Sequence, residues 1–189
     1  MLTNVDIEDA SKKMGIPLAM CGFKSELPKK LKPNVYYCIN LESEQDPESL
    51  KMNQGSHWVG LQIPKLDGHD HSEAVYFDSY GMPPPKIVNR LVQDAIGKKP
   101  WYPTKDIQSI VADTCGYYQL AWAHFVNDDR FETKSLKNDT EKFLSYFNDL
   151  NKTNDYKKNE WVLKHFFRSK DPEFRKPIDI DTSNIVRQS

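Results

Sequence analysis

The sequence predicts an α+β fold in which a small central antiparallel sheet is flanked by helices. Three short segments rich in β-branched and aromatic residues predict strands, at residues 35–41, 57–63 and 74–78. Apolar residues at helical spacing predict helices, at residues 4–14, 87–96, 115–125, 139–150 and 155–167. The chain has 189 residues, which is enough for one domain with a single hydrophobic core.

The first half of the chain supplies most of the predicted sheet. A helix over residues 4–14 is closed by Gly15 and Pro17. Residues 21–33 are rich in Pro, Lys and Gly and predict a loop. The strand at 57–63 alternates apolar and polar residues, and the polar connection after it predicts a hairpin with the strand at 74–78.

The second half is predicted to be mostly helical. A helix over residues 87–96 stops at Gly97, and a short strand is expected at 107–111. Cys115 stands at the start of the next helix, whose apolar face is formed by Tyr118, Ala121, Trp122 and Phe125. We expect a single domain over residues 1–189, with a catalytic core at 1–130, a helical extension at 131–170 and an extended tail at 171–189.

The composition excludes several classes of function. The net charge is -1, so no general attraction to nucleic acid or to an anionic membrane is expected. No apolar run approaches the roughly 20 residues that a membrane helix needs, and no signal peptide is visible. Three cysteines are too few for a disulfide scaffold and favour a reducing compartment.

Four residues in fixed order predict a thiol-protease site: His57, Asp78, Gln108 and Cys115. A cysteine attacks as the thiolate, which a helix N-terminus and a neighbouring imidazolium both favour. His57 is the candidate base, and Asp78, on the neighbouring strand, is placed to orient its ring. The backbone N–H of Cys115 and the side-chain amide of Gln108 are candidate donors to the oxyanion of the tetrahedral intermediate.

Each of these residues also has a structural interpretation. His57 is compatible with a histidine at a strand end, and Asp78 with the start of a turn. Cys21, followed by Gly22, competes as nucleophile, whereas Cys38 lies inside a strand and is interpreted as a small core residue.

Two further patterns each allow two interpretations. The Asp/His run at residues 67–71 suggests either a metal site or a solvated turn. The basic stretch at 98–101 suggests either a nucleic-acid contact or a solvated surface.

At these positions the chain resembles the adenovirus-type cysteine endopeptidases, the adenain family. Those enzymes carry a His-Trp pair, an aromatic-acid-x-aromatic-Gly segment, a Gln seven residues before the nucleophile, and a Cys-Gly that opens a hydrophobic helix. The matching positions are His57-Trp58, residues 77–81, Gln108 and Cys115-Gly116. The resemblance covers residues 1–130, and the last third of the chain matches only as helices.

The resemblance implies a papain-related fold with permuted chain order, close to that of the adenain and SUMO-type proteases. It implies a virally encoded endopeptidase that cleaves capsid and core precursors during maturation, in the virion and the host-cell cytoplasm, and it looks most like the virophage and Maverick/Polinton branch. Its catalytic residues would be His57, Asp78, Gln108 and Cys115. Its substrate-binding residues would be Gly55, Ser56, Trp58 and Gly116. From its position next to His57, we also expect Trp58 to pack beside the imidazole and shield it from water. No metal or other cofactor is expected, and the protein is expected to be a monomer without membrane contact.

The departures from the family keep further functions open. Adenovirus enzymes tend to use Glu where Asp78 stands, and they are activated by a disulfide-linked peptide and by DNA. No cysteine lies between Asp78 and Cys115, so neither activator is carried over to this chain. SUMO-type proteases share the four residues and an acid at the position of Asp113, so a deconjugating isopeptidase is also compatible with the sequence. An acyltransferase, or a catalytically silent assembly protein on the same fold, is compatible with it as well.

Overall fold

Four strands and five α-helices form the described part of the chain, so the predicted α+β class is confirmed. In a computed structural model of the protein, the described residues are 1–42, 57–66, 73–128, 135–168, 182 and 185. The helices are α1 (Asn4–Met14), α3 (Lys86–Ile96), α4 (Cys115–Val126), α5 (Leu136–Leu144) and α6 (Tyr156–Arg168), and a short 3₁₀ turn spans Lys24–Glu26. In this part of the chain, no helix combines the length and the apolar character that crossing a membrane requires.

The sheet contains the strands β1 (Leu18–Phe23), β2 (Val35–Asn40), β3 (Trp58–Ile63) and β4 (Val75–Phe77), in that spatial order. The predicted β3–β4 pairing is confirmed as antiparallel, as is the β2–β3 pairing. The expectation of a purely antiparallel sheet is wrong, because β1 runs parallel to β2. The loop predicted from residue 21 is also wrong at its start. There β1 is a largely half-buried edge strand without the alternating pattern that identifies strands in a sequence.

The strand predicted at residues 107–111 is wrong as well. The outer edge of β4 is occupied by Trp101, whose N–H donates to Ala74 O at 2.9 Å and whose carbonyl accepts from Tyr76 N at 2.9 Å. Residues 109–112 form a turn instead, closed by the hydrogen bond from Ala112 N to Ser109 O at 3.0 Å, in which Ile110 is 89% exposed.

Helix ends follow their local signals closely in α1 and less well in α5. Thr3 caps α1 through a reciprocal capping box with Asp6, and Gly15 ends the helix in the left-handed region at φ 66°. The helix predicted at 139–150 instead begins at Leu136, behind the N-cap Ser135, and ends at Leu144. The chain turns there, and Leu150 N donates to Asp106 O at 2.7 Å, which draws this stretch toward the loop before α4.

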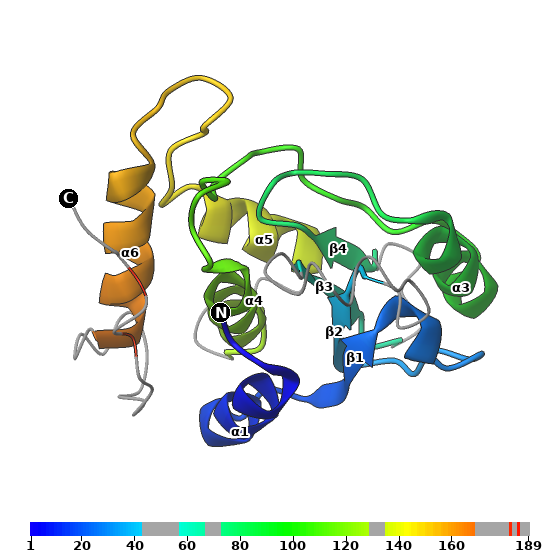
Figure 1. Cartoon of the computed structure of the whole chain (residues 1–189). Helices are drawn as coiled ribbons and strands as arrows, with labels where there is room; N and C mark the ends of the chain where they lie inside the picture. Colours follow the sequence, from blue (N-terminus) through cyan, green and yellow to red (C-terminus); the bar gives the residue numbers. More distant parts are fainter. Residues whose placement is uncertain (43–56, 67–72, 129–134, 169–181, 183–184, 186–189) are drawn as a thin grey trace.

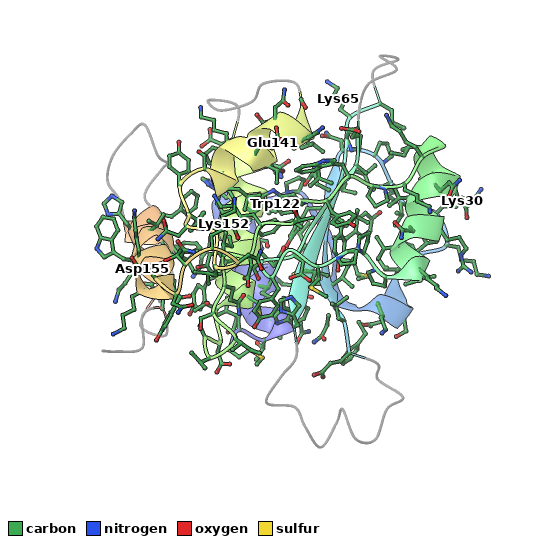
Figure 2. The ribbon with its side chains drawn as sticks, turned by 90° about the horizontal axis from the view of Figure 1, so that it is seen from above. Lys30, Lys65, Trp122, Glu141, Lys152 and Asp155 are labelled. Carbon is green, nitrogen blue, oxygen red and sulfur yellow. The ribbon has the colours of Figure 1, made fainter. Side chains whose placement is uncertain are left out.

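The sheet separates two hydrophobic clusters. Alternate side chains of β2 and β3 pack with α3 on one face, and the other face packs against α1, α4 and α5, with α6 on the far side of α4 (Figure 1). Eleven of the twelve residues of α4 are buried, as expected for a central helix. Figure 2 shows Trp122 of α4 in the middle of the molecule, between Lys30 at one end and Asp155 at the other.

The segment expected as a helical extension shares the core of the rest of the chain. Phe143 of α5 and Leu163, Phe166 and Phe167 of α6 belong to the same cluster as Trp122. Of the expected tail, only Thr182 and Ile185 are described, and both are buried.

Candidate active site

The base and its partner meet at one end of the β3–β4 hairpin. His57 directly precedes β3 and Asp78 directly follows β4, so the antiparallel register brings the two side chains together. His57 Nε2 lies 2.7 Å from Asp78 Oδ1, and the Asp78 side chain is almost fully buried. Leu41 N donates to His57 O at 3.1 Å, which extends the β2–β3 ladder to the histidine backbone. Backbone pairing therefore fixes the orientation of this pair.

The helix that carries the cysteine is docked against the same hairpin by a buried glutamine. Gln119 Nε2 donates to the carbonyls of Trp58 and Phe77, at 3.2 Å each. Gly60 leaves room for this side chain, since a Cβ at residue 60 would collide with the Gln119 amide and with the Trp122 ring. Because Cys115 lies one turn before Gln119 on α4, this contact brings the thiol to the strand end that carries His57.

His57 lies between the acid and the cysteine. Burial acts to lower the pKa of His57, but hydrogen bonds to Asp78 and to Cys115, and the charges of both groups, outweigh burial and raise the pKa from 6.5 to about 9. Because Nε2 faces Asp78, the Nδ1 atom is the ring nitrogen left for the Cys115 thiol. At neutral pH, His57 is therefore an imidazolium that lies beside the first residue of α4.

The turn after β4 holds the acid in place. Asp78 Oδ1 accepts a second hydrogen bond from Tyr80 N at 2.8 Å, and Gly81 N donates to Asp78 O at 2.9 Å. Gly81 has φ 70°, and a side chain there would meet the backbone of Thr104. The turn therefore requires glycine at this position.

Gln108 is held by the same turn rather than by the sheet. Its Oε1 accepts from the Ser79 hydroxyl at 2.6 Å, and its Nε2 donates to Ala112 O at 2.8 Å and to the Tyr80 hydroxyl at 3.3 Å. The backbone N–H of Gln108 donates to Ser79 O at 3.2 Å. Gln108 is thus a buried side chain whose amide is oriented by three partners.

Helix α6 supports the loop between Gln108 and Cys115 through buried polar side chains. Asn159 Nδ2 donates to Ile107 O at 3.0 Å, and Glu160 Oε1 accepts from the Thr114 hydroxyl at 2.9 Å. Tyr118 of α4 also donates to Ile107 O, at 3.1 Å. Asn159 and Glu160 were not predicted from the sequence, since polar residues on an amphipathic helix carry no local signal of burial.

The two other cysteines lie in the sheet. Cys21 of β1 and Cys38 of β2 are register partners, with Cys21 half-buried and Cys38 fully buried. Burial, and then the hydrogen bond and charge of Cys21, raise the pKa of the Cys38 thiol well above its ordinary value. Cys38 is therefore held in the unreactive thiol form, and Cys115 is the cysteine hydrogen-bonded to His57.

The expected substrate-binding residues fall into two groups. Gly55 and Ser56 lie outside the described residues, as does the Asp/His run at 67–71. Trp58 and Gly116 are buried, and both contact Leu2: Trp58 Nε1 donates to Leu2 O at 3.1 Å, and a Cβ on Gly116 would lie 3.1 Å from that of Leu2. The N-terminal segment thus covers this side of the α4 start (Figure 1).

The Tyr80 ring lies beside the His57 imidazole, and the Trp58 indole belongs to the hydrophobic core. The ring centroids of Tyr80 and His57 are 4.6 Å apart, with an interplanar angle of 31°. Tyr80 was predicted from the sequence only as part of a turn, although an aromatic residue two positions after the acid was the available signal. Trp101 of the basic stretch is half-buried and lies under Lys137, whose Nζ is 5.5 Å from the ring centroid.

Comparison with known proteins adds no assignment to this geometry. No protein-family model matches the chain, and a search of curated proteins found no matching sequence.

Proposed function

We propose that the protein is a cysteine endopeptidase that cleaves viral capsid and core precursors. The observation that carries the proposal is the position of His57, which is hydrogen-bonded to the buried carboxylate of Asp78 and to the thiol of Cys115, the first residue of a buried helix. Nucleophile, base and orienting acid in this arrangement are characteristic of thiol-dependent acyl transfer. The proposed fold is the papain-related one with permuted chain order. The observed α+β class, with a small sheet flanked by helices, supports this proposal.

The proposed reaction uses the two nitrogens of His57 for different purposes. The Cys115 thiolate attacks the carbonyl carbon of the scissile amide, and the C=O bond becomes a single bond that carries an oxyanion. The His57 imidazolium then gives its proton to the leaving amine, and the C–N bond breaks to leave a thioester on Cys115. Neutral His57 next removes a proton from water, which attacks the thioester and releases the acid with the free thiolate. Asp78 keeps the ring in one orientation throughout.

The oxyanion needs hydrogen-bond donors near the start of α4. The backbone N–H of Cys115 and the side-chain amide of Gln108 are the proposed donors. To reach the oxyanion, the Gln108 amide would exchange its 3.3 Å bond to the Tyr80 hydroxyl for one to the substrate oxygen. In this proposal the protein acts as a monomer in the maturing virion and in the host-cell cytoplasm, without a cofactor. Its substrates are precursor polypeptides of the particle.

An electrophilic peptide probe tests the nucleophile directly. The probe should label the wild-type protein and the Cys21→Ser and Cys38→Ser variants, and it should leave Cys115→Ser unlabelled. Labelling that persists without Cys115 contradicts the assignment.

Purified protein incubated with capsid precursors and with ubiquitin-like conjugates tests the substrate class. We expect Cys115-dependent cleavage of the precursors. Release of the ubiquitin-like tag alone would make the protein an isopeptidase, and acyl transfer from acyl-CoA would make it an acyltransferase. An absence of all three reactions would favour a silent assembly protein.

A further inference from the structure

Both N–H groups of the Gln108 side-chain amide already donate to protein acceptors, so another group is needed to donate to the oxyanion. A side-chain amide has two N–H donors. One of them is directed at Ala112 O at 2.8 Å, and the other at the Tyr80 hydroxyl at 3.3 Å. The Ala112 carbonyl can only accept and therefore fixes the amino end of Gln108, while the Ser79 hydroxyl donates to Oε1 at 2.6 Å.

The Tyr80 hydroxyl differs from the Gln108 amide, because its donor is still available. It accepts a hydrogen bond from Gln108, and among the described residues no acceptor takes its own proton. A hydroxyl that accepts a hydrogen bond becomes a stronger donor, because polarisation passes along the chain of bonds. Tyr80 therefore has a donor that its neighbour Gln108 strengthens.

The position of Tyr80 makes this donor available to a bound substrate. Its ring lies against the His57 imidazole at 4.6 Å, its backbone N–H is fixed by Asp78 at 2.8 Å, and its side chain is only half-buried. The ring is therefore held beside the His57 imidazole, and the hydroxyl at its end is held by the Gln108 amide, on a side chain that is not sealed from solvent.

The electrostatics favour a phenol that keeps its proton. Burial, followed by the negative charges of Cys115 and Asp78, raises the pKa of Tyr80 to about 12. At neutral pH, Tyr80 is thus a neutral hydrogen-bond donor that feels the charge of the nucleophile.

We propose that the Tyr80 hydroxyl donates a hydrogen bond to the oxyanion when Cys115 attacks the substrate carbonyl, and that Gln108 acts partly through Tyr80 by polarising and orienting it. The proposal rests on the proposed endopeptidase function and adds a catalytic residue to it. The proton stays on the phenol oxygen, so that the charge balance of the attack is unchanged.

The Tyr80→Phe variant tests this role, because it keeps the ring on His57 and removes only the hydroxyl. We expect kcat for a peptide substrate to fall about 10²–10³-fold, with a much smaller change in KM. Alkylation of Cys115 by iodoacetamide needs the thiolate but forms no oxyanion, so its rate and pH profile should stay as in the wild type. Tyr102→Phe, which removes a hydroxyl from another half-buried tyrosine, is the matched control and should keep the wild-type kcat.

A double variant separates direct donation from a shared network. If Gln108 acts through Tyr80, Tyr80→Phe combined with Gln108→Ala should be about as slow as the slower single variant. Independent donors would instead multiply the two losses, which would overturn the proposed relay.

Three results overturn the Tyr80 role. If kcat of Tyr80→Phe stays within about threefold of the wild-type value, the Tyr80 hydroxyl does not donate to the oxyanion. An equal loss of alkylation and turnover in a folded variant shows that Tyr80 serves only to place His57. A wild-type protein that cleaves no polypeptide removes the proposed function itself and the Tyr80 role with it, whereas cleavage by wild type and Tyr80→Phe at similar rates removes the Tyr80 role alone.

Discussion

Two parts of the candidate site are held in place by different kinds of bond. His57 and Asp78 stand at the ends of paired strands, and backbone hydrogen bonds set their separation. Within the described part of the chain, no strand pairs with the loop from Gln108 to Thr114, and side chains of the turn after β4 and of α6 hold it. The first arrangement is local and repetitive, and the second depends on contacts between distant segments. We therefore expect the chemistry to depend most on the hairpin, and the precision of the loop to depend on α6.

The largest expected effect comes from removing His57, the general base held by the β3–β4 hairpin. The His57→Ala variant should lose about 10⁴–10⁶-fold in kcat, because neither the thiolate nor the leaving amine then has a proton partner. Steady-state turnover of a peptide substrate measures this loss. His165→Ala, which removes an exposed histidine stacked on Trp161 of α6, is the matched control and should retain wild-type turnover.

A smaller effect is expected from changing the charge of the acid. The imidazolium–thiolate pair requires a protonated His57, whose pKa is raised to about 9, so kcat/KM should fall as the pH rises through about 9. Asp78→Asn removes a negative charge that raises the pKa of His57. The alkaline limb of the kcat/KM profile should therefore move to lower pH. The rate at the optimum should fall by about 10²-fold or less, because the amide still bonds to the ring. An alkaline limb that stays in place would mean that another group controls it.

The same pKa has a consequence for stability. A histidine whose pKa is raised in the folded protein stabilises that state at pH values below its unfolded pKa, and the stabilisation is lost as the pH rises through the folded value. For His57 this loss falls between pH 6.5 and about 9. Urea unfolding across this range should show the loss in the wild type and a smaller one in Asp78→Asn.

The smallest expected effect comes from removing a contact by which α6 supports the loop from Gln108 to Thr114. Asn159→Ala removes donors to Ile107 O and Asn148 O and the acceptor of Asn148 N, and it should lower the free energy of unfolding by about 1–3 kcal/mol. The displaced loop should also lower kcat while leaving alkylation of Cys115 unchanged. Asn138→Ala, at an exposed position of α5, should change stability by less than about 0.5 kcal/mol. Equal effects of the two substitutions would show that α6 does not support the site.

The same contrast explains how much the sequence could predict. Thr3 and Gly15 mark the ends of α1 by local chemistry, and the alternation in β3 and β4 led to the correct pairing. The strand predicted at 107–111 failed because Ile110 and Val111 suggest a strand, although Trp101 already occupies the edge of β4. β1 was missed because an edge strand that is mostly half-buried has no alternation to read.

Some residues of the candidate site could likewise be predicted from sequence patterns, and others could not. Strand ends and a helix start place His57, Asp78 and Cys115, and these features leave patterns in a sequence. The position of the Tyr80 ring and the burial of Asn159 and Glu160 arise only when α6 and the turn after β4 pack around the loop. No residue spacing encodes contacts of this kind.

The most direct test of the account is the rate at which iodoacetamide alkylates Cys115 as a function of pH, followed by mass spectrometry of the Cys115 peptide in the wild type and in His57→Ala. Because the imidazolium stabilises the thiolate, the wild-type cysteine should react faster than the variant at mildly acidic pH, and the two profiles should converge at strongly alkaline pH. Superimposable profiles over the whole range would contradict the pairing of His57 with Cys115.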